Sequence, residues 1–221
     1  MDEGASKTEQ WVVSNQKYIF IIVGLAALII LGFLGFDKFV QQPKERTAMN
    51  DMYAAQMYFD QAITSTGQDS LFNLSLNGDG GKYGMLDILD IYSGTKAGNL
   101  ANYYVGMAYM NMKDYANAIE YLNEFDSEDD ILGPISKGGI GDAFVQLEQL
   151  DDAFDYYVQA FNLKTNNYTT PMYLQKAGII GLKIGEFEKS LDYFNRIKSD
   201  FPKSNEAKDI DVFIGKAQAL N

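Results

Sequence analysis

The 221-residue chain contains no cysteine and no histidine. Disulfides are therefore impossible, and thiolate nucleophiles and imidazole bases are missing. Zinc sites of the usual Cys/His kind are excluded for the same reason. An enzyme built without these residues would need a carboxylate pair or a Ser/Lys pair in a pocket, and no spacing in this sequence indicates one. We therefore expect a protein that is not an enzyme and that needs neither a cofactor nor a metal.

Positive charge is also scarce. The chain has 18 lysines and arginines against 30 aspartates and glutamates, so its formal net charge is −12. A surface of this sign repels phosphate groups, which argues against nucleic acid as a partner. The acidic run over residues 126–130 lacks the ordered ligand spacing and the internal glycine of a calcium loop, and we interpret it as a solvated loop.

Charge is absent altogether from one stretch near the N-terminus. Residues 18–36 read YIFIIVGLAALIILGFLGF, and a helix of this length nearly crosses the ~30 Å hydrocarbon core of a bilayer. A cleaved signal peptide would have a shorter apolar region and a small-x-small cleavage site, which this run lacks. The pattern predicts an uncleaved transmembrane helix over residues 18–36, preceded by a polar tail over residues 1–17.

The flanking charges do not define the orientation of this helix, because lysines or arginines stand on both sides of it. Its centre has no polar residue, which disfavours transport or proton relay. One narrow face could dock on another membrane helix, although no GxxxG motif is present; simple anchoring is the alternative. The residues of this face are Gly24, Ala27, Leu28, Leu31 and Gly35.

A pair of small residues twelve positions apart recurs three times in the second half of the chain. The copies are spaced by about 35 residues, which is typical of stacked helical arrays. The pairs are Gly106 with Ala118, Gly141 with Ala153, and Gly178 with Ser190. We predict three two-helix repeats over residues 99–203.

Helical segments are also expected on both sides of the repeats. Residues 37–98 contain an apolar stripe at helical spacing and then a glycine-rich turn, so we interpret them as a juxtamembrane region that caps the array. A final helix within residues 204–221 should cover the other end. At the start of the third repeat, Thr170 and Pro171 predict an N-cap followed by the first helical residue.

The repeats resemble the tetratricopeptide repeat. That family has a small residue in the first helix, an aromatic three residues later and a small residue in the second helix. The first two copies match fully, whereas the third has Gly181 for the aromatic and Ser190 for alanine, and keeps the closing Pro202. The matching residues are Gly106, Tyr109 and Ala118, then Gly141, Phe144 and Ala153. The resemblance implies a tetratricopeptide-repeat α-solenoid with a protein-binding role. Together with the apolar run, the expected fold is all-α, with an N-terminal transmembrane helix followed by that solenoid.

One anchor followed by such repeats resembles the YfgM-type ancillary subunits of the bacterial Sec translocon. This resemblance implies an inner (cytoplasmic) membrane location with the repeat domain in the periplasm. It also implies three kinds of protein partner: a SecYEG-like translocon, a PpiD-like membrane-anchored chaperone and exported clients. The alternative is an assembly factor for another envelope complex, in outer-membrane protein insertion or in secretion.

The family also implies where a partner would bind, because the inner face of such an array comes mainly from the first helix of each repeat. At those positions the sequence is largely apolar and rich in methionine, which suits adaptable contacts. These positions carry no lysine or arginine, which disfavours a carboxylate clamp, the basic site with which some tetratricopeptide proteins bind the C-terminal carboxylate of a partner. The expected protein-binding groove comprises Leu100, Tyr103, Met107, Met110, Val145, Met172, Ile179 and Leu182. The alternative is that these residues pack against residues 44–98 or the C-terminal helix of the same chain.

Overall fold

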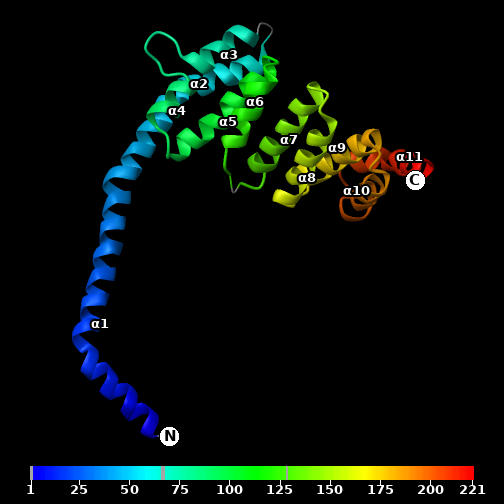
Figure 1. Ribbon diagram of the computed structural model, residues 1–221. Helices are drawn as coiled ribbons and strands as arrows, with labels where there is room; N and C mark the ends of the chain where they lie inside the picture. The colour runs from blue at the N-terminus through cyan, green and yellow to red at the C-terminus, as the bar shows by residue number, and fades with distance from the viewer. Residues whose placement is uncertain (1, 66–67, 128) are drawn as a thin grey trace. The chain divides into compact units, whose positions relative to one another are not determined.

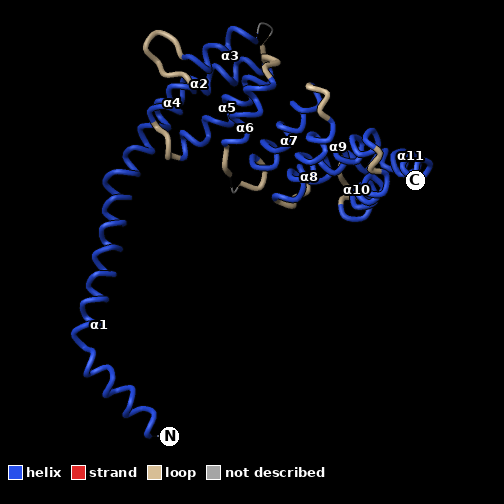
Figure 2. Tube along the Cα trace, viewed as in Figure 1, coloured by secondary structure: helices blue, strands red, loops and turns tan. Residues whose placement is uncertain are grey.

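The computed structural model describes residues 2–65, 68–127 and 129–221. Regular structure in these residues is helical, apart from one isolated bridge between Asp79 and Lys82 (Figure 2). The helices are α1 (Asp2–Phe36), η1 (Asp37–Gln41), α2 (Gln42–Thr64), α3 (Gln68–Asn77), α4 (Met85–Ile91), α5 (Lys96–Asn111), α6 (Tyr115–Glu124), α7 (Leu132–Gln146), α8 (Leu150–Leu163), α9 (Thr169–Ile184), α10 (Phe187–Asp200), η2 (Glu206–Asp209) and α11 (Ile210–Leu220).

The chain divides into two compact units. The N-terminal unit spans residues 1–47 and the repeat unit spans residues 48–221. In the N-terminal unit, α1 is long and apolar enough to cross a membrane, with a mean hydropathy of 2.9 over its most apolar window. The helix begins at Asp2, so the polar residues before the apolar run are helical as well. A π-helical turn, η1, follows the apolar run and precedes Pro43.

In the repeat unit, three successive helix pairs match the three predicted repeats. The pairs are α5 with α6, α7 with α8, and α9 with α10 (Figure 1). Each pair turns through one left-handed residue, seven positions after the repeat glycine: Lys113, Glu148 and Gly185. A backbone hydrogen bond closes each turn, from the amide of the next residue to the carbonyl five positions before it, at 2.8 to 2.9 Å. The helix pairs therefore share one turn geometry although only the third turn has glycine.

Each repeat glycine accommodates a large side chain from the second helix of its own repeat. A Cβ atom built on the glycine would lie 2.4 to 2.7 Å from the nearest side-chain carbon, closer than van der Waals contact allows. The contacts join Gly106 to Leu122, Gly141 to Tyr157, and Gly178 to Phe194. The sequence predicts the glycine from its small partner twelve residues later, but the side chain that fills the space comes sixteen residues later.

The third repeat compensates for its missing aromatic. In the first two repeats the predicted aromatic pairs with a tyrosine of the second helix, Tyr109 with Tyr121 and Phe144 with Tyr156. The third tyrosine, Tyr193, instead lies 6.1 Å from the ring of Phe154 in the preceding repeat. The side chains of Phe154 and Ser190 occupy the space next to Gly181, so that position has no room for an aromatic ring.

Two hydrophobic cores support the repeat unit. The first joins α2, α3 and α4 to α5, and the second joins α8, α9, α10 and α11. Helices α6 and α7, which lie in sequence between the two cores, have buried side chains of their own, including Leu122, Ile140 and Ala143. Residues on both sides of the repeats thus contribute directly to the cores.

Three predicted helix boundaries are wrong. The first repeat begins at Lys96 rather than residue 99, because the Thr95 side chain caps the helix by accepting a hydrogen bond from the Gly98 amide. The third repeat begins at Thr169 rather than Pro171, because the side-chain carbonyl of Asn166 accepts hydrogen bonds from the amides of Tyr168 and Thr169 at 2.8 and 2.7 Å. The expected single helix from residue 204 is a short 3₁₀ turn, η2, followed by α11. Phe213 of α11 packs 5.4 Å from Phe194 of α10.

Candidate protein-binding surface

The eight residues predicted to line a groove lie on the first helices of the three repeats, α5, α7 and α9. All eight are partly buried, neither fully enclosed nor fully exposed. We call this set the A-helix face: Leu100, Tyr103, Met107, Met110, Val145, Met172, Ile179 and Leu182.

Most of the A-helix face is supported by the cores beneath it. Leu100 and Met107 pack against the first core, and Tyr103 lies 5.4 Å from Phe125 at the end of α6. Four others pack against the second core: Val145, Met172, Ile179 and Leu182. The side chains are therefore held in place by their inner edges while their outer edges remain accessible. Packing within the chain thus explains why each of these side chains is partly buried.

The middle of this surface is less apolar than the repeat register predicts. Gly138 is buried, because the ring of Tyr173 from α9 lies directly over it. Asp142 accepts hydrogen bonds from Lys176 Nζ at 2.6 and 2.8 Å and from the Tyr157 hydroxyl at 2.6 Å. A polar cluster of Asp142, Tyr157 and Lys176 therefore joins α7, α8 and α9.

Two tyrosine rings complete this cluster. The rings of Tyr157 and Tyr173 are stacked 6.2 Å apart, and Lys176 Nζ lies 5.6 and 5.7 Å from their centres. Burial, followed by the charge of Asp142, raises the pKa of both tyrosines above the usual value. Both hydroxyls therefore stay protonated at neutral pH, and the Tyr157 hydroxyl acts as a donor to Asp142.

The sequence-based prediction of this surface misses Lys176, which lies two residues before Gly178 and is not among the eight predicted groove residues. Its partner Asp142 is 34 residues away and occupies a different position in its repeat, so only the stacking of adjacent repeats brings the two side chains together. Because Asp142 binds the ammonium group with two short contacts, Lys176 is neutralised within the protein.

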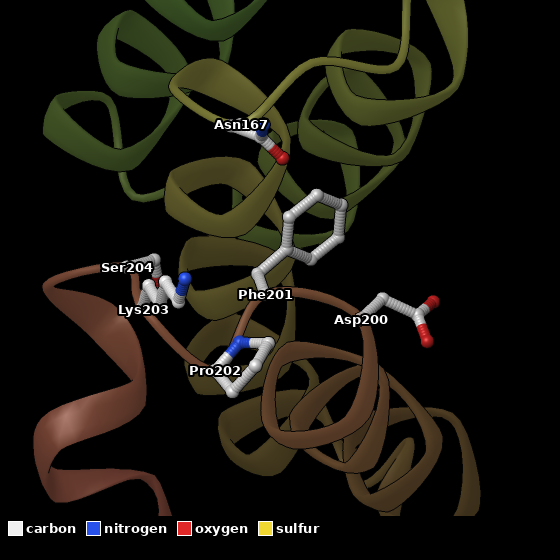
Figure 3. Close-up of a pocket in the computed structure, with 6 residues that line it drawn as sticks. All are labelled: Asn167, Asp200, Phe201, Pro202, Lys203 and Ser204. Carbon is white, nitrogen blue, oxygen red and sulfur yellow. The ribbon is translucent and has the colours of Figure 1, made fainter.

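Two small cavities lie where α10 leads into η2. One of about 220 Å³ is lined by Asn167, Asp200, Phe201, Pro202, Lys203 and Ser204. Figure 3 shows Phe201 pointing toward Asn167, with Asp200 directed away from both. A neighbouring cavity of about 330 Å³ shares three of these residues and reaches Met172 of the A-helix face. The volumes are at or below the lower end for small-molecule sites. Among the described residues, no group of three or more acidic side chains could hold a metal ion.

The predicted contact face of α1 is open within the N-terminal unit. Leu28 and Leu31 are largely exposed. A Cβ atom built on Gly24 or Gly35 would meet no other described atom within 4 Å. These residues, with Ala27, are therefore available for contact with lipid or with another helix.

Comparisons with known proteins agree with the fold. The tetratricopeptide repeat family matches residues 101–129. Two solved structures are similar, both described as Podosopora anserina putative kinesin light chain nearly identical TPR-like repeats, one of them a variant with a single substitution. They are 11% identical in sequence, cover 80% of this chain and 87% and 88% of their own, and give TM-scores of 0.56 and 0.55. The comparison with curated proteins gave no match. The repeat unit is thus a tetratricopeptide-like helical solenoid, a fold typical of protein-binding scaffolds.

Proposed function

We propose that this protein is a membrane-tethered scaffold that binds segments of other proteins on its A-helix face. One observation carries the proposal: eight mostly apolar side chains on the first helices of three repeats are held by the cores yet remain partly exposed. Three of the eight are methionines, whose flexible thioether side chains adapt to different apolar partners. The apolar segment of α1 supplies the tether.

The polar cluster gives this surface a second kind of contact. Asp142 lies on α7, one of the three helices that carry the A-helix face, and is held by Lys176 and Tyr157. A bound segment could therefore combine apolar side chains with a backbone amide or a hydroxyl that donates to Asp142. In this proposal the protein recognises an adaptable apolar segment rather than a free carboxyl end, and it is not an enzyme.

The resemblance in architecture supports a finer proposal for location and partners. The protein is anchored in the inner membrane with the repeat unit in the periplasm, and it acts beside a SecYEG-like translocon and a PpiD-like chaperone that handle exported clients. In this role the face of α1 that carries Gly24 and Gly35 contacts a membrane helix of a partner. An assembly factor for outer-membrane insertion or secretion has the same architecture and is the competing role.

Affinity purification of the full chain from detergent-solubilised membranes tests both the binding surface and the identity of the partners. We expect translocon components or a periplasmic chaperone to co-purify with the natural chain. Met107→Ser together with Ile179→Ser should reduce that recovery, whereas Val212→Ser, at an exposed position of α11, should not. Recovery of outer-membrane assembly or secretion components instead would support the competing role. Equal recovery by all three chains would reject the A-helix face as the binding surface.

A further inference from the structure

Helix α2 has apolar side chains on two faces, and the structure covers only one of them. The first face is fully or almost fully buried in the first core and consists of Ala48, Met52, Ala55, Phe59 and Ala62. On the other side, Met49, Tyr53 and Met57 follow one another at intervals of four residues and are 44%, 64% and 39% exposed. A helix with one face buried in a core normally presents polar residues on its other side, so an exposed second apolar stripe indicates a contact surface.

A hydrogen-bonded loop extends this stripe. The backbones of Asp79 and Lys82 exchange two hydrogen bonds of 2.9 and 3.2 Å, and the Tyr58 hydroxyl donates to the Asp79 carboxylate at 3.1 Å. The loop is therefore tied both to itself and to α2. It places Tyr83, which is 42% exposed, beside the stripe. We call Met49, Tyr53, Met57 and Tyr83 the α2 face.

A cavity of about 330 Å³ lies between the helix and the loop. It is lined by Asn50, Asp51, Tyr53, Ala54, Met57, Gly81, Lys82 and Tyr83. The hydroxyl of Tyr92 donates to the Asp51 carboxylate and so holds that side chain in place. The cavity is large enough for one apolar side chain and is bordered by the fixed carboxylate of Asp51.

The charge around this surface has one predominant sign. Residues 42–96, which include the whole of α2, contain six aspartates and one glutamate against three lysines and one arginine, so the net charge of this part is −3. A partner that approaches here gains if it carries positive charge around its apolar contacts. A second copy of this chain would bring the same acidic surface, and an anionic lipid surface would also be repelled.

We propose that the α2 face docks an amphipathic helix of another protein. In the partner helix, apolar residues recur every three or four positions, and the polar side is rich in lysine and arginine. One apolar side chain enters the cavity, and its neighbours along the helix contact Met49, Tyr53 and Met57. This site lies on a different helix from the A-helix face and does not depend on the function proposed there.

A titration with a synthetic helix tests this directly. Because the chain lacks cysteine, Asn50→Cys introduces a single thiol at the edge of the cavity for an environment-sensitive dye. The full labelled chain in nanodiscs of zwitterionic lipid is titrated with an 18-residue peptide that has leucines at helical spacing and lysines elsewhere. We expect a saturable change in dye emission, and no change with the same peptide carrying glutamates in place of lysines.

Two matched sets of variants decide the outcome. Tyr53→Ser together with Met57→Ser should weaken the binding of the lysine peptide by roughly tenfold or more. Val212→Ser and Met107→Ser, the latter on the A-helix face, should leave the midpoint of the titration unchanged. Circular dichroism checks that each variant has the helical content of the natural chain. An unchanged midpoint in the α2 variant, or equal binding of both peptides, overturns the proposal. An emission change caused by anionic vesicles alone, or by raising the protein concentration alone, assigns the surface to lipid or to self-association and also overturns it.

Discussion

Single glycines control how closely the two helices of a repeat approach. At Gly178, an added Cβ atom would lie 2.4 Å from Cε1 of Phe194, which is fully buried. The same relation holds at Gly141 with the ring of Tyr157. An additional methyl group at these positions would force a ring and its helix outward, because a packed interior has no space to accept it.

Gly178→Ala should therefore destabilise the repeat unit by about 1–3 kcal/mol. Gly215→Ala is the matched control, because Gly215 lies within helix α11 and a Cβ there would meet no atom within 4 Å. That change should be neutral or stabilising by up to about 1 kcal/mol, the ordinary preference of a helix for alanine. Urea unfolding followed by circular dichroism measures both. Equal unfolding midpoints for the two variants would show that the contact between Gly178 and Phe194 does not limit helix approach.

The sequence predicts these glycines but not the side chains that fill the space beside them. The small residues recur as the same or similar types, so their spacing is visible. The filling residues are Leu122, Tyr157 and Phe194, which share size and not identity. The pairing of Asp142 with Lys176 is hidden for a related reason, because only the stacking of adjacent repeats brings the two residues together.

The cluster at Asp142 predicts a sensitivity to alkaline pH. Burial and the nearby carboxylate raise the pKa of Tyr157 above its unfolded value of about 10. The protonated Tyr157 hydroxyl therefore makes its full contribution to the free energy of unfolding below pH 10. That stability is lost as pH rises above 10 toward the folded pKa, at up to about 1.4 kcal/mol per pH unit.

Tyr157→Phe should lower the free energy of unfolding by about 1–2 kcal/mol at pH 8, through loss of the hydrogen bond to Asp142. It should also make the fall between pH 10 and pH 12 shallower than in the natural chain. Tyr168→Phe controls for the substitution itself, because that ring is 70% exposed. Unfolding curves at several pH values provide the comparison. Parallel losses of stability in the natural chain and Tyr157→Phe would exclude this role for Tyr157.

At the scale of helices, the second and third repeats begin by the same device. Asp129 accepts hydrogen bonds from the amides of Ile131 and Leu132, both at 2.7 Å, and so starts α7. Asn166 does the same at the equivalent place, 37 residues later, and starts α9. The residues before α7 and α9 thus satisfy amides that the first helical turn leaves unpaired.

The helices themselves are largely predictable, because apolar periodicity and the recurring small residues locate them. Their first residues are less so. Pro171 suggests a helix that starts at that residue, yet proline is accepted anywhere in the first turn, where its missing amide has no helical partner. The capping side chain, Asn166, lies far enough upstream to add two residues to the helix.

The two caps should respond differently to acid. The backbone hydrogen bonds lower the pKa of Asp129, so its contribution is present above the unfolded value near 4 and is lost as pH falls through the lower folded value. Asn166→Ala should cost about 1 kcal/mol at both pH 7 and acidic pH, because an amide does not titrate. Asp129→Ala should destabilise at pH 7 and lose that effect on acidification. Unfolding midpoints at the two pH values provide the test, and an Asp129→Ala deficit that persists in acid would exclude the charged cap.

Across the whole molecule, the two units differ in net charge. The first 47 residues carry five acidic and five basic side chains, so the entire excess of negative charge lies in the repeat unit. An acidic unit is repelled by anionic lipid headgroups, which keeps its surfaces available to proteins. In this account, the apolar helix holds the chain at the membrane, the A-helix face holds adaptable apolar segments, and the α2 face holds a basic helix.

The most direct test of the central claim is photo-crosslinking in intact cells, with a photoreactive amino acid in place of Ile179 and, separately, of Met107. The account predicts crosslinks from both positions to another polypeptide. The same residue at Val212 should give few or none, because that position is exposed but outside both proposed surfaces. Crosslinks that join only parts of this chain would contradict the account, because the A-helix face would then be covered by the protein's own helices.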